Sequence, residues 1–163
     1  MRLSNPRQGR DGFTLLEVVI VVTILSILTA AAIPLVRNTV KREREADLRL
    51  ALRQLRQAID AYRRFYDANA NSIPIEWRTD SHYPKELKLL VDGFIPANVI
   101  GTTSAKVRFL RRMPVDPITG KAEWGQRSYK DAPDSTSWSG EDVFDVYSTS
   151  SERALNGTLY KDW

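Results

Sequence analysis

One acidic side chain stands alone in a long apolar stretch near the start of the chain. Residues 13–36 contain a single charged residue, Glu17, and the 19 residues from Val18 to Val36 carry no charge. A carboxylate costs roughly 2.5–3.5 kcal/mol in hydrocarbon, so its presence there calls for a compensating positive charge. The alternative interpretation is simpler: Glu17 opens a helix, because the positive end of the helix dipole stabilises acids in the first turn.

The composition excludes several other kinds of chemistry. The 163 residues include no Cys and a single His, His82, which excludes thiolate nucleophiles, disulfide scaffolds, Cys-ligated zinc and multi-histidine metal sites. No Ser-His-Asp arrangement, phosphate-binding loop or paired-acid cleft stands out, so the chain is predicted not to be an enzyme. The 24 Lys and Arg exceed the 20 Asp and Glu by only +4, too little to predict nucleic-acid binding.

The apolar stretch has the length of a membrane-spanning helix. Its 19 uncharged residues, from Val18 to Val36, match the thickness of the hydrocarbon core at about 1.5 Å of rise per residue. Residues 1–12 before it hold three Arg and one Asp, and this basic flank predicts a cytoplasmic N-terminus with the remainder exported. The stretch is longer than the apolar core of a removable signal peptide, so removal after it is the less favoured interpretation. Pro34 is expected to kink the helix.

Residues 37–68 are predicted to continue this helix with one apolar face. Apolar side chains recur there at steps of 4, 3, 4, 3 and 4 residues, which is the helical period. They are Leu48, Leu52, Leu55, Ile59, Tyr62 and Tyr66, with Ala51 and Ala58 widening the stripe. A single helix cannot bury such a stripe, so the rest of the chain has to cover it.

Residues 69–163 are predicted to supply that cover. The patterns indicate a short helix over 83–91 ending before Gly93, strands within 124–129 and 143–148, a loop over 130–142 and a tail that packs back. The four tryptophans, Trp77, Trp124, Trp138 and Trp163, could form a sugar-stacking surface, but packing at the core or its rim is favoured. The predicted fold is α+β: a long N-terminal helix, membrane-spanning in its first half, packed on a small antiparallel sheet with a short second helix and a looped C-terminus.

The junction between leader and apolar stretch resembles that of the type IV pilin-like superfamily. The run from Gly12 and Phe13 to Glu17 carries the resemblance, together with the basic leader and the proline at Pro34. The resemblance implies that a prepilin peptidase removes residues 1–12 by cutting after Gly12 and methylates the new N-terminal Phe13. It also implies that Glu17 acts in assembly, where the free amino group of a neighbouring subunit's Phe13 would supply the compensating charge.

The second half of the chain resembles the major pseudopilin (G-type) of type II secretion systems. The motifs are Tyr83-Pro84, the run 112–117, Trp124-Gly125, the run 145–148 and the end from Gly157 to Trp163, whereas 92–108 match nothing useful. The resemblance implies a single-pass inner-membrane protein with a periplasmic globular part, which polymerises into a pseudopilus to drive protein export. Its implied partners are other copies of itself, minor pseudopilins, prepilin peptidase and an inner-membrane assembly platform. A type IV pilus pilin, or a membrane-anchored periplasmic protein with one span, are the alternatives.

The same resemblance raises the question of a calcium ion near the C-terminus. Family members bind calcium with the Asp of a D-x-x-S stretch and an Asp seven residues later. Here these positions are Asp145, with Ser148 completing the stretch, and Glu152. Glu can also bind calcium, but the glycines usual in this loop are replaced by residues 149–151. The alternative is that Asp145 and Ser148 hold the loop by hydrogen bonds without a metal; no cofactor is otherwise required.

Overall fold

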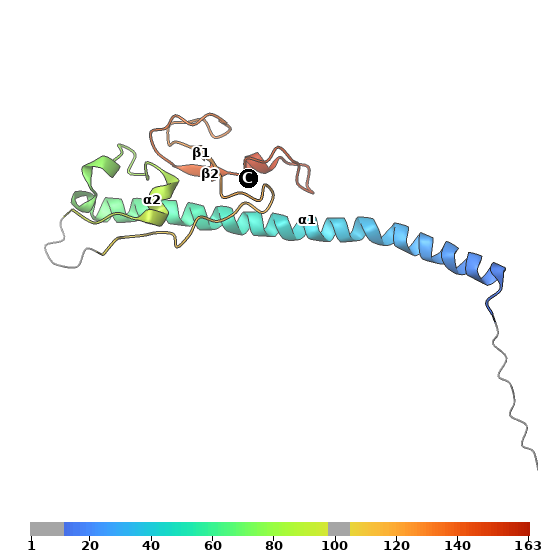
Figure 1. Ribbon diagram of the computed structural model, residues 1–163. Helices are drawn as coiled ribbons and strands as arrows, with labels where there is room; N and C mark the ends of the chain where they lie inside the picture. The colour runs from blue at the N-terminus through green and yellow to red at the C-terminus, as the bar shows by residue number, and fades with distance from the viewer. Residues whose placement is uncertain (1–11, 98–104) are drawn as a thin grey trace, which may run out of the picture. The chain divides into compact units, whose positions relative to one another are not determined.

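The computed structural model of the chain describes residues 12–97 and 105–163, and for residues 31–36 it describes the backbone alone. The main elements are α1 (Leu15–Ala68), α2 (Leu87–Asp92), β1 (Gly125–Arg127) and β2 (Asp145–Tyr147), with short 3-10 turns η1 (Ala70–Ser72), η2 (Ile75–Trp77) and η3 (Tyr160–Asp162) (Figure 1). The chain divides after Val40 into two compact units. The predicted α+β class, with its long N-terminal helix, short second helix and small antiparallel sheet, is confirmed.

The apolar stripe of α1 forms the core of the second unit. All eight side chains of the predicted stripe are buried, and four of them are completely inaccessible to solvent: Leu48, Leu55, Ile59 and Tyr62. The far end of the stripe packs in an aromatic cluster, where the Tyr62 ring lies 5.4 Å from that of Phe109 and 6.2 Å from that of Phe94. Each fully buried apolar side chain contributes roughly 1.5–3 kcal/mol, so the stripe anchors the second unit.

The sheet consists of two short antiparallel strands at the predicted positions. Gly125 pairs with Tyr147, and Arg127 pairs with Asp145. A Cβ atom at Gly125 would lie 2.3 Å from the ring of Tyr147, so only glycine allows the aromatic ring to lie across β1. The residues between the strands form the predicted loop.

Helix α2 begins later than predicted. The sequence pattern places its start at Tyr83, whereas the helix runs from Leu87 to Asp92. The amide of Val143 donates to the carbonyl O of Pro84 at 2.7 Å, and this pairing with the segment before β2 keeps the chain extended. His82, with φ of 65°, turns the backbone just before it. The predicted stop is correct, since Gly93 ends α2 with φ of 68°.

The C-terminal segment packs back onto α1, as predicted. Glu45 of α1 accepts hydrogen bonds through Oε1 from the amide of Leu155 at 2.7 Å and from the hydroxyl of Tyr160 at 3.1 Å. Burial and the bond to Glu45 raise the pKa of Tyr160 to about 12, so its hydroxyl keeps the proton that it donates. The Arg49 guanidinium lies 4.4 Å from the centre of the Trp163 ring. These contacts place residues 153–163 along one face of the helix.

Candidate functional site

The predicted cleavage junction lies in open coil just before α1. Gly12 and Phe13 are both exposed, and the Phe13 side chain keeps 80% of its surface accessible. A Cβ added at Gly12 would meet no atom within 4 Å. The junction is therefore accessible to a peptidase from outside the chain, whereas the leader before Gly12 lies outside the described residues.

Thr14 caps the N-terminus of α1, three residues before the predicted assembly residue Glu17. Its Oγ1 accepts a hydrogen bond from the amide of Glu17 at 3.2 Å, and its carbonyl O accepts one from the amide of Val18 at 3.2 Å. With Thr14 as the N-cap, Glu17 is the third residue of the helix (N3), where the positive end of the helix dipole stabilises an acid. Its carboxylate bonds to no other described residue.

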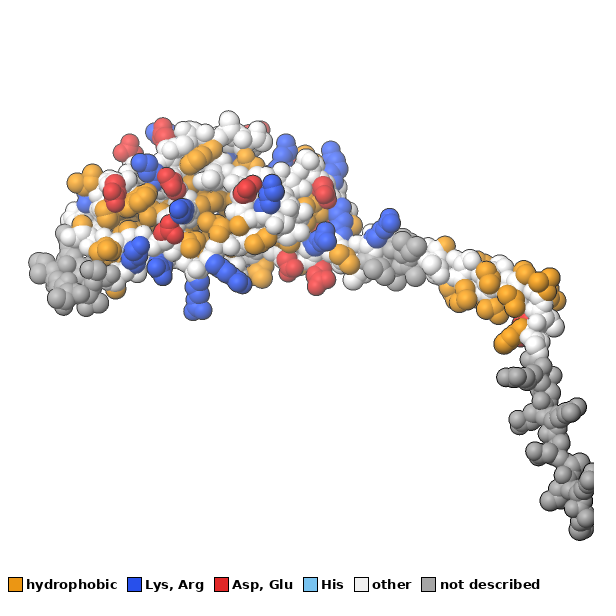
Figure 2. Space-filling view, in the orientation of Figure 1, with side chains coloured by type: hydrophobic (Ala, Val, Ile, Leu, Met, Phe, Trp, Pro, Cys, Tyr) orange, Lys and Arg blue, Asp and Glu red, His pale blue; other side chains and the backbone are white. Residues whose placement is uncertain are grey.

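The first turns of α1 are apolar on every side. The twelve large apolar residues between Phe13 and Leu28 keep 48–85% of their surface exposed, and Figure 2 shows their side chains gathered along this segment. The three hydroxyl side chains donate to carbonyl groups one turn earlier: Thr23 to Val19, Ser26 to Val22 and Thr29 to Leu25. Apart from Glu17, the polar side chains of this segment are satisfied within the helix, which suits it to burial in lipid or among other helices.

Within the part of the chain that is described, no helix is long and apolar enough to qualify as a candidate for crossing a membrane. The kink predicted at Pro34 falls in the stretch 31–36, which lies outside the fully described residues.

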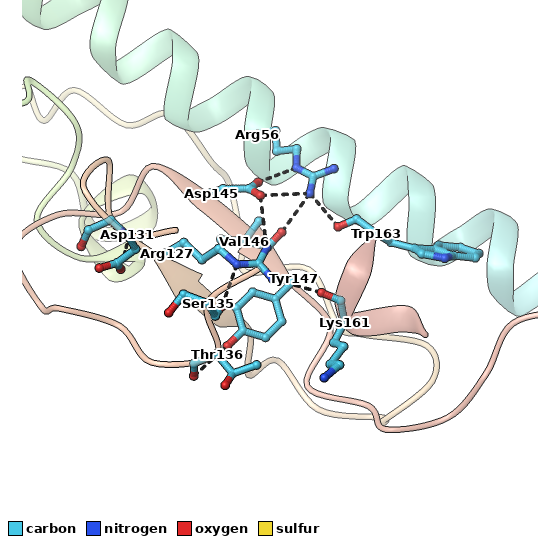
Figure 3. A network of polar contacts seen from close by, with 11 residues as sticks. Arg56, Arg127, Asp131, Ser135, Thr136, Asp145, Val146, Tyr147, Lys161 and Trp163 are labelled. Atoms are coloured by element: carbon cyan, nitrogen blue, oxygen red, sulfur yellow. Dashed lines mark hydrogen bonds and ion pairs between the residues drawn. The ribbon is translucent and has the colours of Figure 1, made fainter. Parts of the chain in front are cut away.

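The first predicted calcium residue, Asp145, faces two guanidinium groups (Figure 3). Arg56 of α1 donates from Nε to Oδ1 at 2.7 Å, and Nη1 of Arg127 lies 3.6 Å from Oδ2. Arg56 also donates from Nη2 to the main-chain O of Val146 and of Trp163 at 3.1 and 2.8 Å. Asp145 is therefore the central acid of a network that joins α1, both strands and the C-terminal segment.

The other two predicted calcium residues lie in different surroundings. Ser148 donates to Oδ2 of Asp116 at 2.6 Å, and neither residue is accessible to solvent. Glu152 is exposed, and its carboxylate bonds to no described residue. A cation at Asp145 would sit beside two guanidinium groups, so these residues do not fit a shared calcium ion. Among residues 12–97 and 105–163, no group of three or more His, Cys, Asp or Glu is placed to hold a metal. Calcium stays a prediction, and the geometry favours the hydrogen-bonded loop.

Sequence reasoning missed the buried polar residues that organise this end of the molecule. Asp116 accepts bonds at Oδ1 from the amides of Ile118 and Thr119 at 2.8 and 3.3 Å. The turn sequence around Pro117 and Gly120 could have indicated this local role. No local signal points to Arg56, because its partners lie 89 to 107 residues further along the chain.

Replacing Asp145 by Asn is expected to lower the stability of the second unit by about 1–2 kcal/mol, or a few degrees in Tm. The change leaves Arg56 and Arg127 without their acid, although partial exposure of Arg56 limits the loss. A chelator should leave the Tm of the unaltered protein unchanged, and Asp134→Asn in the exposed loop should be neutral. A chelator-induced fall in Tm that Asp145→Asn abolishes would instead establish the calcium site.

Comparison with known proteins finds the N-terminal motif and nothing beyond it. Residues 7–33 match the family model described as the prokaryotic N-terminal methylation motif. No curated protein and no solved structure matches the chain. The matched residues include the exposed junction, the Thr14 cap, Glu17 and the apolar turns that follow. The chain therefore carries the prepilin-type signal of type IV pilin-like proteins, which are structural subunits that a prepilin peptidase processes and that form filaments of copies.

Proposed function

We propose that this chain is a structural subunit of a type II secretion pseudopilus, in which it polymerises through its N-terminal helix to drive protein export across the outer membrane. The observation that carries the proposal is a methylation motif over residues 7–33 placed on a capped helix that is apolar on all sides. Such a helix has to be covered by lipid or by other helices. In the proposal, lipid of the inner membrane covers the helix first, and the helices of neighbouring subunits cover it later in the filament core.

The geometry at the start of α1 suits an ion pair between neighbouring subunits. Cleavage after Gly12 creates an amino group on Phe13, one residue before the Thr14 cap. The carboxylate of Glu17 has no partner among the described residues and can pair with the amino group of a neighbouring copy. In the low-dielectric surroundings of lipid or packed helices, this pairing favours the register in which each acid meets an amine.

The choice of a secretion pseudopilus over a pilus rests on the second half of the chain. Four of the five motif segments that resemble the major pseudopilin take part in tertiary contacts. These contacts join Pro84 with Val143, Asp116 with Ser148, and Gly125 with Tyr147. The absence of Cys also argues mildly against pilins that close a C-terminal disulfide loop. The remaining partners in the proposal are minor pseudopilins, the prepilin peptidase and the inner-membrane assembly platform.

Leader removal is the first test of this proposal. When the chain is produced together with a prepilin peptidase, intact-mass measurement should find a protein that starts at Phe13 and is one methyl group heavier. Gly12→Val should block the cut, and since a Cβ there meets nothing within 4 Å, the block reports on the peptidase and not on the fold. A mature protein that starts at Met1, or after Ala32, would contradict the pilin-like function.

Loss of the gene in its own host separates secretion from adhesion or motility. A pseudopilus subunit should leave exported enzymes trapped in the periplasm while surface fibres persist. Normal export combined with the loss of surface fibres would identify the chain as a pilus pilin.

A further inference from the structure

The side of α1 that faces away from the core of the second unit carries a row of arginines. All four are exposed, and they follow one another at steps of 7, 4 and 11 residues, which places them on one side of the helix. They are Arg42, Arg49, Arg53 and Arg64, which together form the arginine stripe. Asp60 is the one acid between them on this side, so the surface has a net charge of +3.

The arginine stripe lacks counter-charges within the described part of its own chain. Arg42, Arg53 and Arg64 make no hydrogen bond, ion pair or ring contact to a described residue. Arg49 contacts the ring of Trp163 and no acid. Like charges along one side of a helix repel one another, so an acidic partner would stabilise this surface.

The loop between β1 and β2 has the opposite charge. Residues 130–142, the acidic loop, hold four acids and one lysine, a net charge of −3. Asp134 is exposed, and its carboxylate bonds to no described residue. Glu141 is exposed as well and pairs with Lys130 at 2.7 Å. Carboxylates of the acidic loop are therefore accessible to a partner.

Exposed aromatic side chains border the acidic loop. Tyr129 precedes it and Phe144 follows it, with 58% and 43% of their surface exposed, and their rings lie 5.5 Å apart. Trp138, within the loop, is also exposed. Aromatic residues are enriched where proteins contact one another, and guanidinium groups stack on their faces. The loop thus offers carboxylates and aromatic faces together, and arginine binds both.

We infer that the acidic loop of one copy docks on the arginine stripe of the next copy. The two surfaces carry opposite net charges, and guanidinium groups pair with carboxylates as well as stacking on aromatic rings. Because two different surfaces of the chain meet, the contact is heterologous and can repeat along a filament. A lipid or nucleic acid would occupy the arginine stripe alone and leave the acidic loop without a role. The inference rests on the proposed function, since it names a contact within the proposed filament.

Cross-linking of introduced cysteines tests the contact directly, because the chain contains no Cys of its own. Gln57→Cys changes an exposed position beside the arginine stripe, Ala132→Cys changes one in the acidic loop, and neither alters a charge. Sheared filaments of the double variant, treated with a short bis-maleimide, should give a ladder of covalent oligomers. Each single variant should stay monomeric, and filaments mixed from the two should stop at dimers, because the contact is heterologous.

Charge reversal tests whether the arginines and the acids hold this contact. Arg53→Glu with Arg64→Glu should lower the yield of sheared filaments at least about tenfold, because like charges would then face each other. Asp134→Lys with Glu141→Lys should do the same. All four changes combined should restore most of the yield. Since the four positions are exposed, the Tm of the second unit should stay close to that of the unaltered protein.

The matched control reverses two cations outside both surfaces. Lys106 and Arg111 are exposed and make no contact to a described residue. Lys106→Glu with Arg111→Glu changes the net charge as much as the arginine-stripe variant does, and it should assemble normally. An equal loss of filaments in this control would mean that net charge alone decides assembly, and the inference would be wrong.

The remaining outcomes separate the inference from the proposed function. Filaments that form but give no ladder, or a combined variant that assembles no better than either pair, would overturn the inference and leave the proposed function in place. A chain that is cut before Phe13 and forms no polymer would overturn both. If Arg53→Glu with Arg64→Glu assembles normally but no longer binds vesicles of anionic phospholipid, the arginine stripe is a lipid-binding surface and the inference is wrong.

Discussion

Replacing Glu17 by Ala is expected to abolish filament assembly while the second unit stays folded and the leader is still cut. The acid has no partner among the described residues, so in the proposed filament its loss leaves a neighbouring Phe13 amino group without a counter-charge in poorly solvated surroundings. Removing one member of such a pair costs roughly 3–5 kcal/mol, equivalent to more than about a hundredfold in a subunit equilibrium. The measurement compares the yield of sheared filaments with the amount of subunit retained in the membrane.

Thr14→Ala is the matched control for the simpler interpretation of Glu17. It removes the cap on the Glu17 amide, at a cost of about 1 kcal/mol, but keeps the carboxylate, so assembly should remain close to normal. Glu17→Asp keeps the charge with a shorter reach and should assemble poorly. If Glu17→Ala assembles normally in a strain with no other copy of the subunit, or if Thr14→Ala fails equally, then the acid serves only to start the helix.

Leu55→Asp should unfold the second unit. Leu55 lies in the middle of the apolar stripe of α1 and has no solvent-accessible surface. The substitution loses its packing, typically about 2–5 kcal/mol, and places an unpaired charge in the core. Because a domain of this size is stable by only about 5–15 kcal/mol, little native structure should remain. Tryptophan fluorescence reports on this unit selectively, since all four tryptophans lie within it.

Leu50→Asp provides the corresponding control on the same helix. Leu50 keeps 53% of its surface exposed, and surface changes of this kind usually alter stability by less than about 0.5 kcal/mol. Equal thermal transitions for the two variants would mean that the stripe does not face the core.

The positions of helices and strands could largely be predicted, because they depend on residues close to one another in the sequence. The stripe of α1 follows from the helical repeat of apolar side chains, and every member of it is buried. The junction at Gly12, the position of Glu17 in the first turn and the stop of α2 at Gly93 are likewise local. Sequence patterns also located β1 and β2, which lie within the predicted segments 124–129 and 143–148; the aromatic and β-branched residues of those segments suit a small sheet packed on one side.

The tertiary structure decided how polar groups far apart in the chain are paired. The predicted start of α2 was wrong because Pro84 pairs with Val143. This partner lies 59 residues away, and no local pattern reveals it. Asp145 could be a calcium ligand by its motif, yet the fold sets Arg56 and Arg127 beside it. Helical and strand periods are properties of neighbouring residues, whereas the partner of a charge depends on which distant segments the core brings together.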